Sequence, residues 1–287
     1  MIEAELLLNT ASRGVTQPKF FHCNDNNIYL VKFNHPINFN RILLNEYFAY
    51  NLAIHLGLPM PEMRLINISS QLCDLYPSVP GLTPGIKIGF LKEDIEDNST
   101  ATGTLNEPYI TLFNKVDNKE VFPEILAFDA LIHNGDRTNN EGNFILTSTG
   151  YNSYHMKIID HGHAFFGPEG NPQRLHLLRT FNEVHLNLLG IIYDAIKGHI
   201  DLTTGTNPFL NIINKIEGID VNDLTIMLSK VPKNWGINSV EIEALKRFVL
   251  DRQFTVKYTI NTLTNGGYFP LWKKEVLPWQ GLLASSL

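Results

Sequence analysis

The chain has 287 residues, of which 44% are hydrophobic and 18% are charged, and this apolar share excludes global disorder. Because 29 acidic residues outnumber 23 basic ones, for a net charge of −6, general binding to nucleic-acid phosphates is not expected. Only two cysteines are present, and no apolar run approaches the ~20 residues that span a bilayer. The N-terminus also lacks the basic stretch of a signal peptide, so we expect a soluble cytoplasmic protein with no membrane partner.

Short β-rich segments dominate the first 90 residues. They are residues 20–21, 28–33, 63–68 and 86–90. The second of them alternates around Lys32, as a half-buried strand does. One helix interrupts the strands, because leucine or phenylalanine recurs every four residues from Leu44 to Leu56 and Gly57 then ends the pattern.

Helical patterns dominate the chain beyond residue 90. The helices are expected at residues 121–133, 182–199, 208–216, 221–230 and 239–263. A short strand pair, 144–146 and 156–159, lies between the first two of them. This order predicts an α+β protein with two lobes, a β-rich N-terminal lobe (residues 1–90) and a mainly helical C-terminal lobe (residues 91–287), with the active site between them.

Two polar clusters interrupt the apolar segments of the second lobe. Residues 134–143 lie between a helix and a strand, and residues 160–163 directly follow the other strand. Antiparallel pairing of these strands would make Asn143 and Asp160 neighbours, with Asp136 on the loop just before. Two oxygen ligands suit Mg²⁺, which takes its other ligands from water and phosphates, and a carboxylate left over can accept the proton of a hydroxyl.

A phosphoryl donor also needs a cation on its phosphates, and Lys32 in the middle of its strand is the candidate. Glu46, on the helix 14 residues later, is placed to hold this lysine as an ion pair. Upstream, a turn rich in hydroxyl and amide donors is positioned to cover phosphates, and it contains Gly14, Thr16 and Gln17. Each residue alone has an ordinary explanation on an exposed strand, helix or turn, and only their order favours a shared site.

The order of a strand lysine, a helix glutamate, an Asp-Arg loop that ends in Asn before a strand, and Asp-x-Gly is similar to that of the protein-kinase-like fold. Within that fold the sequence resembles the HipA-like kinases, a bacterial group of serine/threonine kinases, in a compact form without the extra N-terminal domain of toxin members. The matching stretches are RGVTQP (13–18), YLVKF (29–33), NEYFA (45–49), LGLP (56–59), FDALIHNGDRT (128–138) and IIDHGHAF (158–165). Their common order, over most of the chain, carries the resemblance.

The resemblance implies a kinase that needs ATP and Mg²⁺ and transfers the γ-phosphate of ATP to a protein hydroxyl. It makes Asp136 the catalytic base and Asn143 and Asp160 the metal ligands. The implied cofactor-binding residues are Lys32, Glu46, Gly14, Thr16, Gln17, Ile86, Ile88 and Phe90. The last three would belong to the adenine-contacting strand and hinge, and a regulatory partner protein is a further expectation.

The catalytic loop departs from the family spacing, in which the metal-binding Asn follows the Asp by five residues. That position holds Glu141, whereas Asn143 lies seven residues after Asp136 and directly precedes the strand. We therefore expect a two-residue insertion, with Asn139, Asn140 and Glu141 as the other candidate ligands. The insertion leaves open a pseudokinase-type module that binds nucleotide and regulates a partner. The same fold acting on a small molecule or lipid is a further alternative, because no general rule predicts acceptor specificity from the loops of the second lobe.

Histidines near the polar clusters suggest a different class of site. His133, His161 and His163, together with Asp136 and Asp160, are candidate ligands of a metallohydrolase. This hypothesis is the weaker one, because the order of these residues departs from that of metallophosphatase segments. The sequence has no Gly-x-Ser-x-Gly, P-loop or Gly-x-Gly-x-x-Gly motif, which argues against serine hydrolases and ordinary nucleotide-binding folds.

Overall fold

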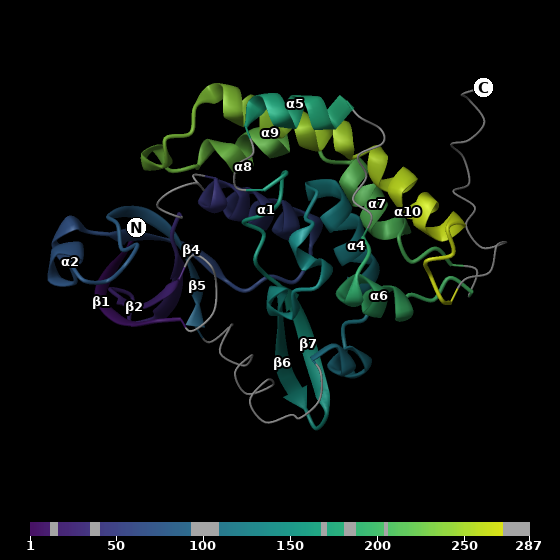
Figure 1. Ribbon diagram of the computed structural model, residues 1–287, viewed down its shortest axis with the longest axis horizontal. Helices are drawn as coiled ribbons and strands as arrows, with labels where there is room; N and C mark the ends of the chain where they lie inside the picture. Colours follow the sequence, from purple (N-terminus) through teal and green to yellow (C-terminus); the bar gives the residue numbers. More distant parts are fainter. Residues whose placement is uncertain are drawn as a thin grey trace.

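The computed structural model describes residues 1–11, 17–34, 41–92, 109–167, 171–180, 188–203 and 206–271. Strands dominate the first part of the chain and helices the second, as Figure 1 shows. No helix in the described ranges combines the length and hydropathy that crossing a membrane requires.

Within residues 1–11, 17–34 and 41–92 the structure has five strands and two α-helices. These are β1 (Ile2–Thr10), β2 (Lys19–Cys23), β3 (Ile28–Lys32), α1 (Ile42–Leu56), β4 (Met63–Ile68), α2 (Ser70–Leu75) and β5 (Gly85–Leu91). The strands form a closed barrel in the order β1-β2-β3-β5-β4, in which only β1 and β4 pair in parallel. Apolar side chains fill its interior, among them Phe21, Tyr29, Val31 and Ile66.

Neither β1 nor α2 is among the elements that the sequence predicts. The sequence of β1 alternates only over residues 2–6, the last of which begins a run of three leucines, and most residues of the strand are exposed or half-buried, so its pattern is not that of a strand with one buried face throughout. Helix α2 is only six residues long, and Ser69 caps its N-terminus: the Ser69 side chain accepts the backbone N–H of Leu72 at 3.0 Å. Such a short helix has no room for a helical hydrophobic period.

The C-terminal part is mainly helical. Its elements are the 3₁₀ helix η2 (Tyr109–Lys115), α4 (Val121–Ile132), η3 (Asp136–Thr138), η4 (Glu141–Asn143), β6 (Phe144–Gly150), β7 (Ser153–Ile158), α5 (Pro172–Thr180), α6 (Ile191–Gly198), α7 (Leu210–Glu217), α8 (Val221–Ser229), η5 (Lys233–Trp235), α9 (Ser239–Arg252) and α10 (Thr255–Asn265). Every residue of α4 except Glu124 is buried, because α6, α7, α9 and α10 surround this helix. The predicted strand pair is confirmed, and both strands run further toward the tip of the hairpin than expected.

Two predicted helices differ from the structure. The segment 239–263 forms two helices, α9 and α10, instead of one. The side-chain hydroxyl of Thr255 donates to the carbonyl oxygen of Arg252 at 2.8 Å, a local bond that competes with the helical ladder at this point. Of the predicted helix 182–199, residues 182–187 lie outside the described ranges, residues 188–190 are not helical, and α6 begins only at Ile191, after Gly190 with φ 116°.

Helix α1 joins the two parts of the molecule. Leu43 and Tyr47 pack with Ile88 of β5 on the outside of the barrel, while Phe48 and Leu52 belong to the core of the helical part. The helix ends as predicted, since Gly57 takes the left-handed conformation (φ 83°) that favours glycine. A residue of α1 can therefore contact both β3 and the polar loops of the helical part.

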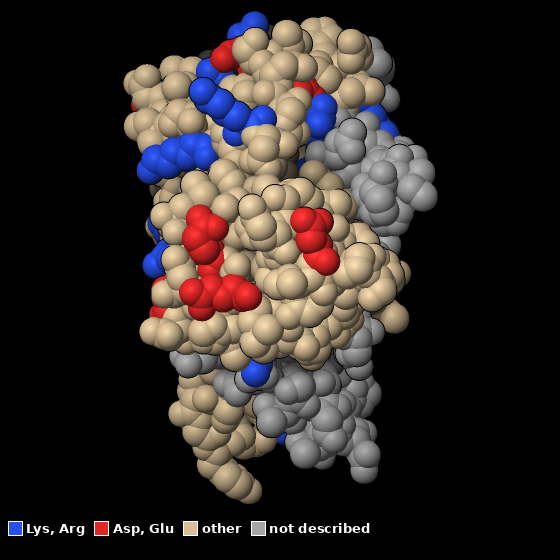
Figure 2. Space-filling view, turned by 90° about the vertical axis from the view of Figure 1, so that its left-hand side faces the viewer, with Lys and Arg blue, Asp and Glu red and all other residues tan. Residues whose placement is uncertain are grey.

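Charged side chains are separated on the side of the molecule that Figure 2 shows. Most of the acidic residues on this face lie at the level of the barrel, and most of the basic residues lie at the level of α8 and α9, where some acidic side chains also occur. This face therefore presents regions of opposite sign instead of one basic surface.

Candidate active site

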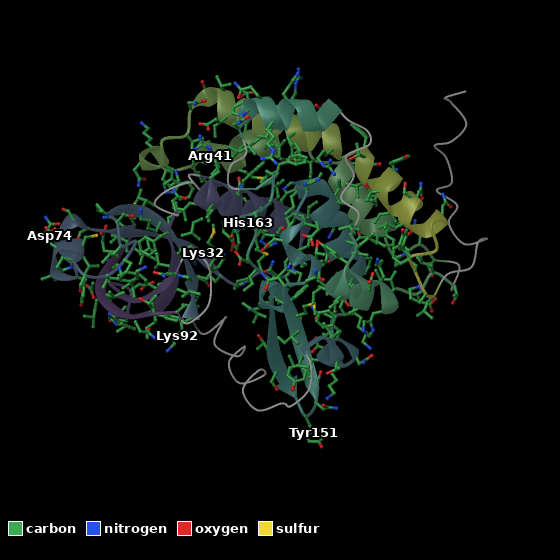
Figure 3. The ribbon with its side chains drawn as sticks, in the orientation of Figure 1. Lys32, Arg41, Asp74, Lys92, Tyr151 and His163 are labelled. Carbon is green, nitrogen blue, oxygen red and sulfur yellow. The ribbon has the colours of Figure 1, made fainter. Side chains whose placement is uncertain are left out.

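Three predicted site residues meet where the barrel faces the helical part. The ammonium nitrogen of Lys32 lies 3.1 Å from Glu46 Oε2 and 2.9 Å from Asp160 Oδ1. Lys32 comes from β3, Glu46 from the second turn of α1, and Asp160 from the loop after β7. In Figure 3 Lys32 and His163 lie between the barrel and the helices. The structure thus brings together residues that are 14 and 128 positions apart in the chain.

The charges of these three groups depend on one another. Burial alone lowers the pKa of Lys32, but the carboxylates of Asp160 and Glu46 outweigh it and raise that pKa above its ordinary value. The ammonium of Lys32 in turn lowers the pKa of Asp160. Burial raises the pKa of Glu46 in spite of the same neighbour. Lys32 is therefore a fixed cation, and Asp160, whose side chain is 42% exposed, is an accessible carboxylate.

The backbone around Asp160 takes a conformation that residues with a side chain seldom adopt. Asp160 has φ 63°, and the consecutive residues Phe165, Phe166 and Gly167 have φ of 55°, 67° and 87°. The N–H of His161 donates to Glu46 Oε2 at 2.9 Å, which ties the loop to α1. Strained backbone of this kind is held in place by its surroundings and clusters at functional sites.

Asp136 and Asn143 form a second pair. Asn143 Nδ2 donates to Asp136 Oδ2 at 3.1 Å, so the two residues predicted to flank the inserted loop are in contact. The N–H of Ile159 donates to the carbonyl oxygen of Asn143 at 3.2 Å, and Phe144 pairs with Ile158 in the hairpin. The ladder therefore places Asn143 beside the strand end that leads into Asp160, as the sequence predicts.

The other amide candidates of this loop have structural partners. Asn139 Oδ1 accepts the N–H of Ile191 at 3.2 Å, and Asn140 Oδ1 accepts the N–H of Gly142 at 3.1 Å. The side chain of Glu141 lies outside the described residues. Among the described candidates, Asn143 alone contacts Asp136 through its side chain.

One oxygen of this region is suited to a ligand. Asn143 Oδ1 is buried and has no hydrogen-bond partner. A buried acceptor without a donor is costly, and a cation would satisfy it. With the accessible carboxylate of Asp160 it supplies the oxygen donors that a hard divalent cation prefers, so the residues present fit Mg²⁺.

A buried ion pair that was not predicted from the sequence supports the loop that carries Asp136. Arg137 Nε donates to Asp129 Oδ2 at 2.7 Å, and both side chains are fully buried. The guanidinium also donates to the carbonyl oxygen of Asn143 and, at 3.0 Å, to His161 Nε2. Asp129 is the one buried charged residue of the mainly apolar helix α4, and a buried charge of this kind needs a partner.

The histidines do not assemble a metal centre. Within the described ranges, no group of three or more His, Cys, Asp or Glu residues is placed to hold a metal ion. His161 accepts from Arg137, and burial holds the pKa of His161 well below its ordinary value, so its ring is neutral. His133 ends α4 with φ 52° and stacks on Phe166 at 3.9 Å between ring centroids. These contacts argue against the metallohydrolase hypothesis.

The remaining predicted residues belong to the turn that was predicted to cover the phosphates and to β5. Gly14 and Thr16 are outside the described residues, and Gln17 contributes its carbonyl oxygen to the ammonium of Lys19 at 2.9 Å. The ring of Phe90 of β5 lies beneath the ammonium of Lys32, whose nitrogen is 5.5 Å from the ring centroid.

The other two predicted residues of β5, Ile88 and Ile86, have different partners. Ile88 pairs with Lys32 in the ladder, and the carbonyl oxygen of Ile86 accepts the indole N–H of Trp235 at 2.7 Å. The segment predicted as the adenine-contacting strand and hinge, residues 86–90, lies within β5 and is described throughout.

Comparison with known proteins gives one family and several structures. A family model described as HipA-like kinase matches residues 5–185. The crystal structure of the Helicobacter pylori proinflammatory kinase CtkA is similar, with a TM-score of 0.56 and 16% identity over 91% of this chain and 96% of that chain. The Golgi casein kinase with bound Mn/ADP has a TM-score of 0.42 and 14% identity, over 91% of this chain and 74% of that chain. A search of curated protein sequences finds no match. The similarity to CtkA shows a kinase-like fold.

Proposed function

Because the chain belongs to the HipA-like kinase family, we propose that it is an ATP- and Mg²⁺-dependent phosphotransferase that passes the γ-phosphate of ATP to a hydroxyl of a protein. The observation that carries this proposal is the contact of Lys32 with both Glu46 and Asp160. Phosphoryl transfer depends on positioning and charge stabilisation, and a fixed cation beside an accessible carboxylate supplies both. The nucleotide would lie between an N-terminal lobe, residues 1–90, and a C-terminal lobe, residues 91–287.

Each residue of the site has a separate task in this proposal. Lys32, oriented by Glu46, donates to the phosphates, and Phe90 and Ile88 border the space beside it. Asp136 accepts the proton of the acceptor hydroxyl, and the amide of Asn143 orients its carboxylate at 3.1 Å.

The residues that would hold Mg²⁺ are Asn143, through its unpartnered Oδ1, and Asp160. When bound, Mg²⁺ supplies neutralisation of phosphate charge. The chain's own contribution is to keep Asp160 ionised, since the ammonium of Lys32 lowers its pKa.

The experiment that tests the proposal compares the unmutated protein with Asp136→Asn. ATP consumption and phosphate addition are followed by intact-mass spectrometry with Mg²⁺ and candidate protein acceptors. We expect turnover to fall roughly 10²–10⁴-fold, because the general base is lost, and ATP affinity to change only a few fold. Asp74→Asn is the matched control, since Asp74 lies exposed on α2 at the far side of the barrel (Figure 3).

The outcomes separate the candidate functions. Unchanged phosphotransfer in Asp136→Asn would remove Asp136 from the role of base. Binding of Mg²⁺·ATP without turnover in the unmutated protein would favour a nucleotide-binding regulatory module. Phosphate transfer to small molecules or lipids but not to proteins would keep the site and change the acceptor.

A further inference from the structure

The residue before Glu46 makes three hydrogen bonds to the loop that follows Asp160. Asn45 is 3% exposed, and its Nδ2 donates to the carbonyl oxygens of Gly162 at 3.0 Å, Ala164 at 3.0 Å and Gly167 at 3.3 Å. These acceptors lie at least 117 positions away in the sequence. A side-chain amide that serves three carbonyls of one segment acts as a clamp on the path of that segment.

The clamped segment, residues 160–167, has little regular structure of its own. Four of its residues have positive φ, so no continuous ladder satisfies its backbone groups. Two of its N–H groups find partners on neighbouring helices instead. His161 donates to Glu46 Oε2 at 2.9 Å, and Phe165 donates to the carbonyl oxygen of Ile132 at 2.7 Å. Asn45 therefore donates to backbone carbonyl oxygens of this loop, and Glu46 accepts a backbone N–H of the same loop.

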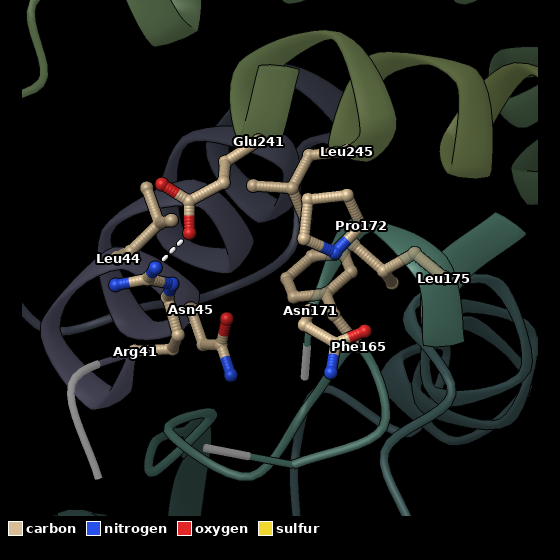
Figure 4. Close-up of a pocket in the computed structure, with 9 residues that line it drawn as sticks. All are labelled: Arg41, Leu44, Asn45, Phe165, Asn171, Pro172, Leu175, Glu241 and Leu245. Carbon is tan, nitrogen blue, oxygen red and sulfur yellow. Dashed lines mark hydrogen bonds and ion pairs between the residues drawn. The ribbon is translucent and has the colours of Figure 1, made fainter. Parts of the chain in front are cut away.

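The helix that carries this clamp is itself anchored. Arg41, one turn before Asn45, pairs with Glu241 of α9 across a small pocket that Asn45 and Phe165 also line (Figure 4). The ring of Phe165 stacks on Phe48 of α1, with 5.2 Å between centroids. These contacts hold the start of α1 in place, so its side chains can fix the position of the loop.

We propose that Asn45 is a positioning residue for the reaction: by tying the carbonyls of Gly162, Ala164 and Gly167 to α1, it sets the place of the Asp160 carboxylate relative to Lys32 and Asn143. The inference rests on the proposed function, in which Asp160 is a metal ligand. Asn45 acts through the backbone and touches neither nucleotide nor metal. Removing a residue that orients a metal ligand without touching the metal typically lowers metal affinity or activity 10–100-fold.

The kinetic test compares Asn45→Ala and the milder Asn45→Ser with Asn51→Ala. Asn51 is a matched control, because it lies on the same helix and its Nδ2 donates to the carbonyl oxygen of Tyr47 at 2.7 Å. We expect the Mg²⁺ concentration at half-maximal rate to rise roughly 10–100-fold in Asn45→Ala, with a smaller rise in Asn45→Ser. A role in stability alone would lower Tm and leave this concentration unchanged, as in Asn51→Ala.

A second measurement is independent of activity. Hydrogen exchange of the His161 and Phe165 amides reports opening of the clamped loop, because both are bonded to groups outside it. Exchange at least about tenfold faster in the Asn45 variants, with Asn51→Ala unchanged, supports the clamp. Unchanged exchange and an unchanged Mg²⁺ requirement overturn it. If the unmutated protein transfers no phosphate, the proposed function fails and the exchange measurement alone decides whether Asn45 holds the loop.

Discussion

Replacing Arg137 by methionine is the sharpest test of how the loop that carries Asp136 is supported. The guanidinium joins four segments, since it donates to Asp129 on α4, to the carbonyl oxygen of Asn143 and to His161, and itself comes from η3. Methionine has a similar length, but it removes all these donors. The substitution leaves the carboxylate of Asp129 buried with the hydroxyl of Tyr193 and the amide of Asn134 as its remaining partners.

The expected loss of stability follows from burial. Breaking a fully buried ion pair by removing one partner costs about 3–5 kcal/mol, because the other charge stays uncompensated. At roughly 2–3 °C per kcal/mol for a chain of this size, Tm should fall by about 6–15 °C. Arg64→Met is the matched control, since Arg64 is 52% exposed and pairs with Glu62 at 2.7 Å. A surface pair of this kind contributes at most about 1 kcal/mol.

The loss should also depend on pH in a defined direction. Burial raises the pKa of Asp129, and Arg137 opposes that rise, so the substitution raises the pKa further. The folded variant then holds the proton of Asp129 more tightly than the unfolded chain does. Its stability is fully present below the ordinary pKa of aspartate and declines as pH rises toward the folded pKa. The deficit in Tm should therefore be larger at pH 8 than at pH 5.

Thermal unfolding of Arg137→Met, Arg64→Met and the unmutated protein at both pH values provides the assay. A loss in Arg137→Met no larger than that in Arg64→Met, or a deficit that shrinks as pH rises, would refute this account of the buried pair. The double variant Asp129→Asn/Arg137→Met should recover part of the stability, because no charge is then left unpaired.

Two further predictions concern the same region. Gly190→Ala should cost at least about 2 kcal/mol in urea unfolding, because Gly190 has φ 116° and an added Cβ would lie 2.4 Å from Thr138 Cγ2. Gly198→Ala, where an added Cβ meets no atom within 4 Å, is its control and should be neutral or stabilising by up to ~1 kcal/mol; equal losses in the two variants would contradict the steric argument. Burial lowers the pKa of His133 to about 4, so the unfolded chain takes up this proton first and stability should fall by about 1–2 kcal/mol as pH drops from 7 to 5. His133→Asn, which tolerates the left-handed φ of 52°, should reduce that fall, and an identical Tm profile in both proteins would rule out His133 as its source.

Much of the site could be anticipated from local patterns. Four-residue spacing and Gly57 locate α1, and with it Glu46, because a helix needs only its own periodicity and a terminator to be recognised. The hairpin of β6 and β7 places Asn143 near Asp160 through the alternation of two short strands. Lys32 on its strand completes the set: the sequence predicted its ion pair with Glu46 but not its contact with Asp160.

Other contacts could not be predicted from the sequence and are known only from the tertiary structure. The parallel pairing of Ile2 with Ile66, which closes the barrel, joins segments whose sequences carry no shared signal. The reach of Asn45 to the loop after Asp160 likewise depends on how distant segments pack. The pairing of Asp129 with Arg137, eight residues later, depends on how the chain turns after α4.

Local secondary structure could be predicted and tertiary contacts could not, for a physical reason. Helix and strand periods, helix ends and turns arise from the backbone geometry of a few adjacent residues, so the sequence by itself determined α1, the β6–β7 hairpin and the order of Lys32, Glu46, Asp136, Asn143 and Asp160. A buried polar group needs a partner but does not specify which one, since any donor that packing brings within reach can satisfy it. Only the tertiary structure therefore decided that Asp129 serves Arg137 and that Asn45 holds the loop of the candidate metal ligand.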